Sequence, residues 1–328
     1  MRVAITGASG HIGGNLARAL VARGDTVVAL VHDAARSLDG VDVKRVDGDV
    51  RDADSLARAF RDVERVFHLA ARISISAQED PAVEAINVGG TRNALASARA
   101  AGVKRFIHFS SIHAISPLPL SAMVDETRPL VEGPGELPYD RSKAAAQREV
   151  MKGAAEGFDA LVVNPTAVIG PHDFAPSHVG KLLVDLAQRR MPGLVDGGFS
   201  WVDVRDVVAG ALAAAERGRA GEAYLLSGHW LSVRDLALVV ERVTGARPPR
   251  IVSPMWLARA CAPFATAWAK LRHTTPRLTS ASLKALRHHR HISSAKAEAE
   301  LGYTSRPTEE TLRDTFAWFR ARGVLDGK

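Results

Sequence analysis

The N-terminal third of the chain alternates between short apolar runs and longer stretches whose apolar residues recur every three or four positions. The short runs are rich in β-branched residues and predict buried strands, whereas the periodic stretches predict amphipathic helices. Because helices separate the predicted strands, the pattern indicates βαβ units and a parallel sheet. The strands are Val3–Ile5, Thr26–Val31, Val43–Val46, Arg65–Leu69 and Arg105–Ser110, and the helices are a stretch from Ile12 onward, Ala53–Arg61 and Ala82–Ala101, which Pro81 precedes.

The pattern changes after residue 111. Residues 112–138 contain five prolines and predict a loop. A helix over 139–155 and a sixth strand, Ala160–Asn164, follow the loop. Beyond residue 170 the regular alternation ends, and most of the remaining chain has helical periodicity. The predicted elements there are helices over 175–190, 205–217, 254–272, 279–287, 293–301 and 308–322, a strand over Ala223–Ser227, and a helix that starts at a capping box, Ser232–Asp235.

A glycine-spaced turn joins the first strand to the first helix. Gly7, Gly10 and Gly13 form a Gly-x-x-Gly-x-x-Gly pattern, and a strand, a glycine-rich turn and a helix are the context that a dinucleotide-binding loop requires. Gly7 would allow the tight turn, Gly10 the approach of the pyrophosphate, and Gly13 close packing of helix on strand. The free N–H groups at the helix start would face the phosphates. A bare strand–helix turn without a ligand is the alternative.

Together these features predict an α/β protein with a Rossmann-type, doubly wound parallel sheet and a smaller, mostly helical C-terminal cap that binds substrate. Residues 1–170 would form the dinucleotide-binding domain, which also receives parts of 200–230. Residues 171–328 would mainly form the cap, interleaved with the sheet. Ligands of such sheets bind at the carboxyl ends of the strands, so we expect the functional site there.

The composition is that of an ordinary globular protein, with 46% hydrophobic and 24% charged residues and a net charge of +7. Lys and Arg are interspersed with Asp and Glu, which favours a solvated basic surface over a nucleic-acid site. Cys261 is the only cysteine, and this excludes a disulfide framework and a thiolate metal cluster. The chain begins with a strand and lacks an apolar stretch near the ~20 residues of a membrane span. We therefore expect a cytoplasmic protein.

Tyr139 and Lys143 carry the strongest indication of chemistry. They are four residues apart on a predicted helix, so their side chains share one face. A tyrosine has an ordinary pKa of ~10, and an adjacent ammonium group would lower that pKa by stabilising the phenolate. Such a tyrosine can give or take the proton of a substrate hydroxyl while hydride moves to or from a nicotinamide. A surface pair without function is the alternative.

The end of the fifth strand should supply a third group to this site. Ser111 could donate a hydrogen bond to a substrate carbonyl oxygen and to the tyrosine, and Ser110 is the second choice. His113 lies on the loop that follows. It could bind substrate or relay a proton, or it could be a structural histidine.

Several motifs now extend the pattern along the chain, and together they resemble an extended short-chain dehydrogenase/reductase. The nearest branch is the one that contains dihydroflavonol reductases and the hopanoid-associated sugar epimerases. The resemblance covers nearly the whole chain and is far more specific for the superfamily than for a substrate. The motifs are Thr6–Gly13, His68–Ala71, Asn87–Thr91, Ser110-Ser111, Tyr139-x-x-x-Lys143, Asn164–Pro171, Val202–Val207, Ser293–Ala297 and Glu300–Tyr303.

The resemblance implies a set of residues that bind the dinucleotide. The glycine turn would hold the pyrophosphate, Asp49 and Val50 would contact adenine, and Lys143 would also hydrogen-bond the nicotinamide ribose. The remaining residues with an implied cofactor role are Gly7, Ser9, Gly10, His11, Ile12, Gly13, Leu69, Ala70, Ala71, Ser110, Tyr139, Pro165, Thr166 and Val168. Simple strand termination also explains Ala70, Ala71 and Pro165.

The end of the second strand bears on the choice of cofactor. An NAD-type site has a carboxylate there for the ribose hydroxyls, but Val31 stands in the position where epimerase-like relatives carry the acid. His32 stands where relatives of the reductase branch often carry an arginine for the 2′-phosphate, and Arg36 follows within reach. A guanidinium is the natural partner of a phosphate. We therefore expect a preference for NADP(H), with NAD(H) as the alternative.

The resemblance leaves three functions open. Relatives that act on sugar nucleotides usually carry an arginine shortly before the Val202 motif, and Gly197–Trp201 fills that segment here. This favours an NADP(H)-dependent oxidoreductase that reduces a ketone or aldehyde, or oxidises the alcohol, of a small, fairly apolar substrate. A nucleotide-sugar epimerase or dehydratase with retained NAD(P) is the alternative, and a non-catalytic NADP-sensing protein is a third. Phe199 and Trp201 could line an apolar pocket or pack in the core.

Three further features complete the expectations. Residues 255–271 contain Trp256 and Trp268 at helical apolar spacing. A cap helix that buries its aromatics is favoured there over an interfacial membrane helix. His288, His289 and His291 are grouped with no carboxylate or thiol and predict basic surface, not a metal site. We expect a monomer or a homodimer, the latter through the helices at 82–101 and 139–155.

Overall fold

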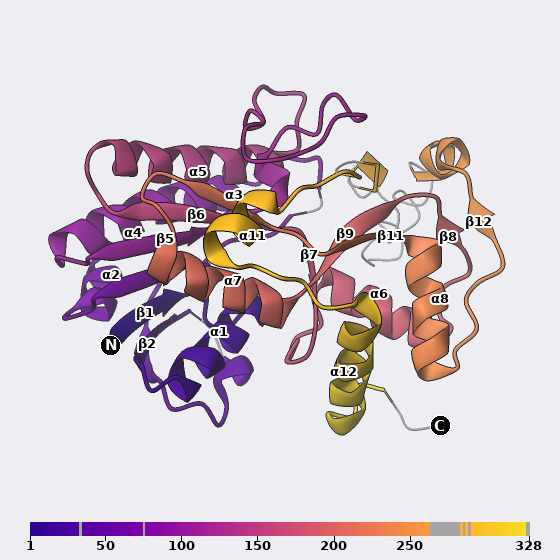
Figure 1. Ribbon diagram of the computed structural model, residues 1–328, viewed down its shortest axis with the longest axis horizontal. Coiled ribbons are helices and arrows are strands. Elements are labelled where there is room, and N and C mark those ends of the chain that lie inside the picture. Colours follow the sequence, from indigo (N-terminus) through magenta and orange to yellow (C-terminus); the bar gives the residue numbers. More distant parts are fainter. Residues whose placement is uncertain (33–34, 75, 263–282, 285, 288–289, 326–328) are drawn as a thin grey trace.

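The computed structural model describes residues 1–325 except 33–34, 75, 263–282, 285 and 288–289. Its centre is a seven-stranded sheet in the order β10-β6-β5-β4-β1-β2-β3, and all neighbouring strands in it are parallel. The sheet and its helices lie on the left in Figure 1. The part on the right, which we call the cap, comprises the described residues of 167–203, 228–290 and 304–325. The predicted Rossmann-type sheet is confirmed.

The strands of the central sheet agree with their predicted bounds to within one residue at each end. They are β1 (Arg2–Thr6), β2 (Thr26–Val31), β3 (Lys44–Asp47), β4 (Arg65–His68), β5 (Arg105–Phe109), β6 (Ala160–Pro165) and β10 (Ala223–Leu226). The helices that flank them are α1 (His11–Ala22), α2 (Ala53–Phe60), α4 (Gly90–Ala100), α5 (Pro138–Ala155), α7 (Val204–Arg217) and α11 (Ala295–Leu301), with short 3-10 turns at η1 (Arg36–Leu38) and η3 (Ile112–Ala114).

Both faces of the sheet are buried, which explains why its strands are apolar without alternation. Successive side chains of a strand point to opposite faces. Val3 and Ile5 of β1 therefore pack with α1, α7 and α11, whereas Ala4 packs with α2, α4 and α5. The two hydrophobic layers hold the carboxyl ends of the strands at one edge of the sheet.

The predicted helix over 82–101 is interrupted. It consists of α3 (Pro81–Glu84), a π-helical turn η2 (Ala85–Gly89) and α4. The extra residue of a π turn re-aims the side chains that it carries. Asn87 lies in this turn and points into the interior, where it is 2% exposed. The helical period of the sequence does not reveal such a local change of pitch.

The cap contains strands that the sequence did not indicate. A three-stranded sheet has the order β11-β9-β7, and a second pair joins β12 to β8. These strands are short and assemble from distant segments, so they lack a readable period. They are β7 (Ala167–Ile169), β8 (Leu194–Val195), β9 (Gly198–Asp203), β11 (His229–Ser232) and β12 (Val252–Ser253), and the cap helices are α6 (His178–Ala187), α8 (Val233–Thr244) and α12 (Thr308–Ala321).

The prediction that the 255–271 segment buries its aromatics is wrong for Trp256. Residues 255–262 are helical, and Ala258 and Ala262 pack against Leu283. Trp256 points the other way and is 70% exposed. Small alanines form the buried face of this helix, so the tryptophan is left outside. Trp268, the helix predicted beyond residue 262, most of the one over 279–287, and His288 and His289 lie outside the described residues.

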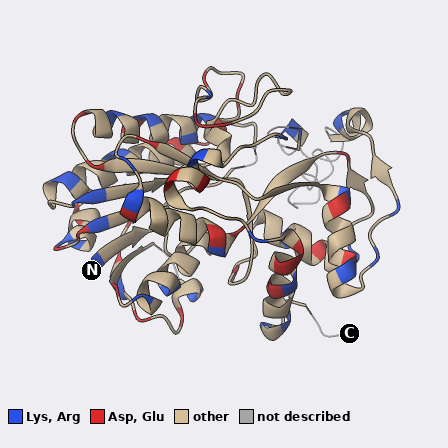
Figure 2. Ribbon diagram, in the orientation of Figure 1, with Lys and Arg blue, Asp and Glu red and all other residues tan. Residues whose placement is uncertain are grey.

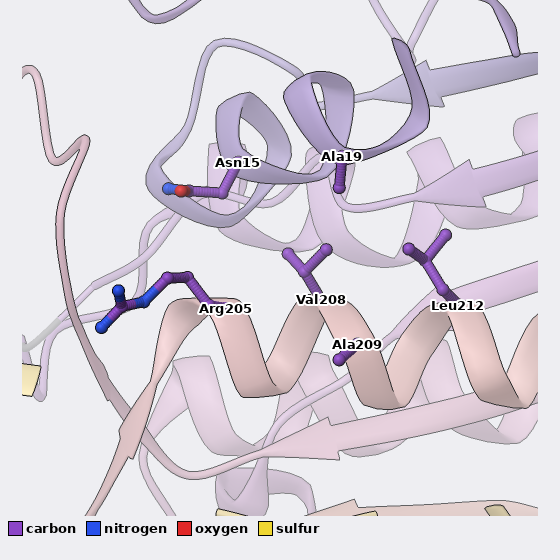
Figure 3. Close-up of a pocket in the computed structure, with 6 residues that line it drawn as sticks. All are labelled: Asn15, Ala19, Arg205, Val208, Ala209 and Leu212. Carbon is purple, nitrogen blue, oxygen red and sulfur yellow. The ribbon is translucent and has the colours of Figure 1, made fainter. Parts of the chain in front are cut away.

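The start of α7 joins the sheet to the C-terminal segment. Asp206 accepts hydrogen bonds from the backbone N–H of Arg306 at 2.8 Å and from its guanidinium at 2.8 and 2.9 Å. Arg205 binds both Asp203, at 2.7 Å, and Asp314 of α12, at 2.6 Å. A small hollow of about 180 Å³ lies between α1 and α7 beside Arg205 (Figure 3). It is lined by Asn15, Ala19, Arg205, Val208, Ala209 and Leu212.

Candidate active site

The turn between β1 and α1 is so tight that two of its glycines admit no side chain. Gly7 has a φ of 73°, which favours glycine, and a Cβ on it would lie 2.7 Å from the backbone nitrogen of Ala70. A Cβ on Gly13 would lie 2.2 Å from the carbonyl oxygen of Gly7. Gly10 is exposed, and a Cβ on it would meet only that same oxygen, at 3.4 Å. The outer surface of the turn at Gly10 is thus open to a ligand.

The start of α1 fits an anionic group. No side chain of the described residues caps the helix at Gly10, and its first turn has no acidic residue. The first N–H groups of a helix have no partner within the helix and attract phosphate. The side chain of His11 lies against Pro171, with Nε2 3.0 Å from the carbonyl oxygen, so His11 would offer its backbone N–H. These features fit the pyrophosphate of a dinucleotide.

Two basic side chains, His32 and Arg51, contact one carboxylate at the ends of β2 and β3. His32 Nε2 lies 3.1 Å from Asp49 Oδ2, and Arg51 binds the same oxygen at 2.6 Å. The hydrogen bond from Arg51 is the main cause that lowers the pKa of Asp49. Arg36 is exposed on η1, and Val31 is buried at the end of β2. Arg51 therefore already compensates the charge of Asp49.

The structure brings Ser111, Tyr139 and Lys143 together at the carboxyl end of β5. Tyr139 and Lys143 lie one turn apart on α5. The Ser111 side chain hydrogen-bonds Tyr139. Lys143 Nζ donates to the carbonyl oxygen of Phe109, the last residue of β5, at 2.7 Å. The lysine thus ties the helix to the strand that presents the serine.

Burial sets the pKa values of both helix residues. It lowers the pKa of Lys143 to about 8. Burial, and next the carboxylate of Asp140, raise the pKa of Tyr139, and the hydrogen bond with Ser111 opposes this only in part. The expectation that Lys143 gives Tyr139 a lowered pKa is therefore wrong, because desolvation of the phenolate dominates. Tyr139 stays protonated at neutral pH and is suited to donate a proton.

A chain of buried hydrogen bonds links the glycine turn to the helix of Tyr139. Thr6 Oγ1, at the end of β1, lies 2.7 Å from His68 Nδ1, and His68 Nε2 lies 3.0 Å from Thr91 Oγ1. Thr91 donates its own proton to the carbonyl oxygen of Asn87, at 2.7 Å, so it must accept from His68. His68 therefore carries its proton on Nε2. Burial lowers its pKa to about 3, which keeps the ring neutral.

Asn87 continues this chain from the π turn to α5. Its side-chain nitrogen donates to Ser142 Oγ at 2.9 Å, and Ser142 Oγ donates to the carbonyl oxygen of Tyr139 at 2.7 Å. Asn87 also exchanges two hydrogen bonds with the backbone of Arg72, just after β4. The backbone of Tyr139 is thus linked through Ser142 of its own helix to Asn87 in the π turn.

His113 lies beside the tyrosine. Its Nδ1 is 3.1 Å from Asp140 Oδ1, and its ring meets the Tyr139 ring edge-on with centroids 5.8 Å apart. Asp140 is buried, whereas the His113 side chain is 32% exposed. The imidazole is therefore oriented by a carboxylate and partly open to the outside, next to the hydroxyl that would donate the proton.

The other predicted residues lie near strand ends, beside the glycine turn or in the interior. Leu69, Ala70 and Ala71 directly follow β4, Pro165, Thr166 and Val168 span the end of β6 and β7, and Ser9 and Ile12 flank Gly10. Val50 is buried against Gly90. Ser110 Oγ is buried without a hydrogen-bond partner among the described residues. Trp201 is 2% exposed and donates its indole N–H to the carbonyl oxygen of Leu231, so it packs in the cap core, with Phe199 edge-on at 5.2 Å.

Four residues of this region were not singled out from the sequence. Arg51, His68, Asn87 and Asp140 acquire their roles only through contacts made by the fold. Asp140 could have been noticed as a carboxylate directly after the tyrosine, and His68 and Asn87 belong to motifs quoted above. For Arg51 the sequence offered no signal.

The comparisons with known proteins agree with this geometry. The model of the NAD dependent epimerase/dehydratase family matches residues 3–227. The chain therefore belongs to that family and is an enzyme of the extended short-chain dehydrogenase/reductase type. Enzymes of this family depend on NAD(P) and act on small molecules.

Three relatives cover nearly the whole chain. The chain is 38% identical to Sterol demethylase protein B of Methylococcus capsulatus, over 99% of this chain and 100% of that protein. It is 32% identical to a Synechocystis protein provisionally named dihydroflavonol 4-reductase, over 98% and 95% of the two chains. It is also 32% identical, over 94% of each chain, to a farnesyl-dihydroquinoline-oxide ketoreductase of Stigmatella aurantiaca.

Solved structures resemble the fold throughout. The crystal structure of gox2253 superposes with a TM-score of 0.85 at 32% identity over 99% of both chains. A nucleoside-diphosphate-sugar epimerase of Pseudomonas aeruginosa superposes with a TM-score of 0.81 at 26% identity, again over 99% of both chains. Within the described residues, no helix combines the length and the apolar character that a bilayer span requires.

The glycine turn yields a matched pair of substitutions. Gly13→Ala places a Cβ against backbone atoms that cannot move aside, and we expect a loss of about 3 kcal/mol in the free energy of unfolding. Gly10→Ala should change that free energy by less than ~1 kcal/mol but weaken dinucleotide binding at least about tenfold, since it obstructs the open surface. Urea unfolding and cofactor titration measure the two effects. Unchanged binding by Gly10→Ala would show that the pyrophosphate lies elsewhere.

Lys143 should make the stability depend on pH. Its folded pKa of about 8 lies below its unfolded value of ~10.4, so the cost of burying the charge is fully present below about pH 8 and disappears as the pH rises toward ~10.4. Between about pH 7.5 and 9.5, wild type should gain about 2 kcal/mol relative to Lys143→Met. Urea unfolding at both values tests this. Lys152→Met, which removes an exposed lysine of the same helix, is the control and should show no such gain.

Proposed function

We propose that this enzyme is an NADP(H)-dependent reductase that converts a ketone or aldehyde of a small, fairly apolar substrate into an alcohol. The observation that carries the proposal is the hydrogen-bonded pair Ser111 and Tyr139, with Tyr139 kept protonated by burial. Reduction of a carbonyl needs a proton donor at neutral pH. A tyrosine whose pKa is raised serves that direction better than the reverse one.

The residues divide the chemistry among them. When bound, NADPH would supply a hydride to the carbonyl carbon. Tyr139 donates its hydroxyl proton to the carbonyl oxygen, so that the C=O double bond becomes the C–O–H of the alcohol. Ser111 donates a hydrogen bond to the same oxygen, and Lys143, bonded to the Phe109 carbonyl oxygen, holds α5 against the end of β5. A proton from solvent then restores the Tyr139 hydroxyl. His113, oriented by Asp140, would contact the substrate beside that oxygen.

An apolar substrate is supported by the cap and by the relatives. The segment 197–201 carries glycine, phenylalanine, serine and tryptophan in place of an arginine for a nucleotide. Relatives that cover nearly the whole chain are named for a sterol and for a farnesylated quinoline. Phe199, which is only partly buried on β9, is the aromatic of this segment that we assign to the pocket. In this proposal, residues 1–170 form the dinucleotide-binding domain and residues 171–328 mainly form the substrate-binding cap. The enzyme acts as a monomer or as a homodimer.

The preference for NADP(H) rests on charge. Val31, an apolar residue, ends β2, and His32 and Arg51 contact Asp49, with Arg36 exposed on the neighbouring turn η1. A 2′-phosphate would gain charge-assisted hydrogen bonds from these groups. The ribose hydroxyls of NAD(H) would gain much less.

Removal of the Tyr139 hydroxyl tests the reaction. Tyr139→Phe should lower kcat for an apolar ketone at least about 100-fold, because proton donation is lost, while NADPH binding stays near wild type. The measurement is NADPH consumption against a panel of steroid, alkyl and aryl carbonyl compounds. In the same assay, His113→Gln should raise KM more than it lowers kcat. If no carbonyl compound is turned over and a nucleotide sugar is epimerised without net NADPH consumption, the enzyme is an epimerase.

Reversal of one charge tests the cofactor preference. Arg36→Glu should raise the Kd for NADPH by roughly tenfold or more, since a charged hydrogen bond is lost and a repulsion is added. The Kd for NADH should change by less than about twofold. Lys44→Glu, an equal charge change at an exposed residue of β3, is the control. A wild-type enzyme that binds NADH more tightly than NADPH contradicts the preference.

A further inference from the structure

The positive charge of this protein is concentrated in one segment of the chain. Residues 242–297 hold eleven of the 43 Lys and Arg residues and none of the 36 Asp and Glu residues. The other 272 residues therefore have 32 basic and 36 acidic side chains and are slightly acidic. The even mixing of charges expected above is thus wrong for this segment. Such asymmetry indicates a polyanionic partner.

The cap exposes part of this segment as a mixed surface, which we call the basic–apolar face. It consists of Arg247, Arg250, Ile251, Val252, Trp256, Leu257 and Arg259, all exposed. Trp256 is 70% and Ile251 68% exposed. Four large apolar side chains in seven consecutive positions are more than the scattered exposure of a globular surface. In Figure 2 the part that carries β12 and the helix 255–262, at the right of the view, contains blue and no red.

Within the described residues, the arginines of this face form no ion pair that would hold the fold. Three basic residues of the wider segment are in ion pairs, Arg242 with Glu309, Lys284 with Glu136 and Lys296 with Glu222. By contrast, no ion pair joins Arg247, Arg250 or Arg259 to a carboxylate of the described residues. Their charges are therefore directed to the outside.

A cavity adjoins the face and has the same character. It measures about 550 Å³ and is lined by Asp196, Met255, Trp256, Arg259, Arg287 and Arg290. Three guanidinium groups against one carboxylate favour an anionic group, and Met255 and Trp256 add apolar lining. Arg290 is stacked on Trp230, 5.6 Å from the ring centroid, which fixes one wall.

We infer that the basic–apolar face docks the cap on the surface of an anionic lipid bilayer. Arginines would bind lipid phosphates, and Trp256, Leu257 and Ile251 would enter the interface, where tryptophan is favoured. A lipid surface matches both properties of the face at once. A nucleic acid would match the charge but not the aliphatic side chains, and an acidic protein would lack the phosphate layer. The cap would lie on the membrane without crossing it.

This docking would place the cap side of the active site near the membrane. Lys284, in the same acid-free segment, binds Glu136 at 2.6 Å, and Glu136 lies three residues before Tyr139. In Figure 1 the loop 112–137 and the helix 255–262 both lie along the upper edge of the molecule. A lipophilic substrate could then pass from the bilayer to the cap without crossing water. The docking itself does not rest on the proposed reductase activity.

Flotation of the full chain with vesicles tests the inference. Binding to phosphatidylcholine vesicles that contain phosphatidylglycerol is expected, with little binding to phosphatidylcholine alone, and raised salt should weaken it. A basic residue near an anionic surface is worth roughly fivefold in binding, so Arg250→Glu with Arg259→Glu should weaken the partition on the order of 25-fold or more. Trp256→Ser should weaken it roughly tenfold.

The matched control is Lys44→Glu with Arg61→Glu, an equal charge change at exposed residues of the nucleotide-binding side. It should bind vesicles as wild type does. An equal loss in this control would overturn the inference, as would binding that does not depend on phosphatidylglycerol, or tighter binding to a single-stranded oligonucleotide than to vesicles. If Trp256→Ser does not fold, fluorescence quenching by spin-labelled lipid answers the same question. The lipid should quench the tryptophan fluorescence of the wild type and quench that of Trp256→Phe less.

Discussion

Polar groups buried at the carboxyl edge of the seven-stranded sheet constrain the half of the molecule that is built on this sheet. Thr6, His68, Thr91 and Asn87 are almost fully buried, and each unsatisfied member would cost about 1–3 kcal/mol. Each of these groups donates a hydrogen bond to the next one, from Thr6 through His68 and Thr91 to the backbone of Asn87. This order fixes the proton of His68 on Nε2. This series of hydrogen bonds runs from β1 through β4 to the π turn and on to α5. It therefore sets the spacing between the glycine turn and α5. Fully satisfied networks of this kind rigidify the site that they support.

The same burial determines the acid–base character of the site. Desolvation disfavours any charged form, and it acts in opposite directions on a phenol and an amine. It raises the pKa of Tyr139 and lowers that of Lys143 to about 8, so at neutral pH both groups hold their protons. Both directions follow from burial alone and need no ligand. This agrees with membership of a family that includes reductases and dehydrogenases.

The two halves of the molecule differ in charge and in what they expose. The half built on the seven-stranded sheet forms ion pairs among its own residues, for example Arg51 with Asp49 and Arg99 with Glu156. The segment 242–297 has no acidic residue with which to do so. Its partners in the described part of the chain, such as Glu136 and Glu222, come from other segments. The cap thus combines ion pairs to the sheet with an outer face of apolar side chains and of arginines that have no carboxylate partner among the described residues.

The sequence by itself determined the central sheet and the glycine turn. Val3–Ile5 and its neighbours are short apolar runs bounded by breakers, and Gly7 and Gly13 stand where backbone atoms leave no room for a Cβ. These are local properties, so periodicity and residue type suffice to predict them. The pairing of Tyr139 with Lys143 followed from helical spacing in the same way.

Only the tertiary structure decided the rest. The strands of the cap are two to six residues long and pair across distant segments, which local patterns cannot reveal. The direction of the pKa shift at Tyr139 depends on burial, which is set by all surrounding elements and outweighs the hydrogen bond with Ser111. Trp256 was assigned to the core because apolar spacing alone does not say which face of a helix finds a partner. Ala258 and Ala262 pack against Leu283. Because this face of the helix is buried, Trp256 on another face is exposed.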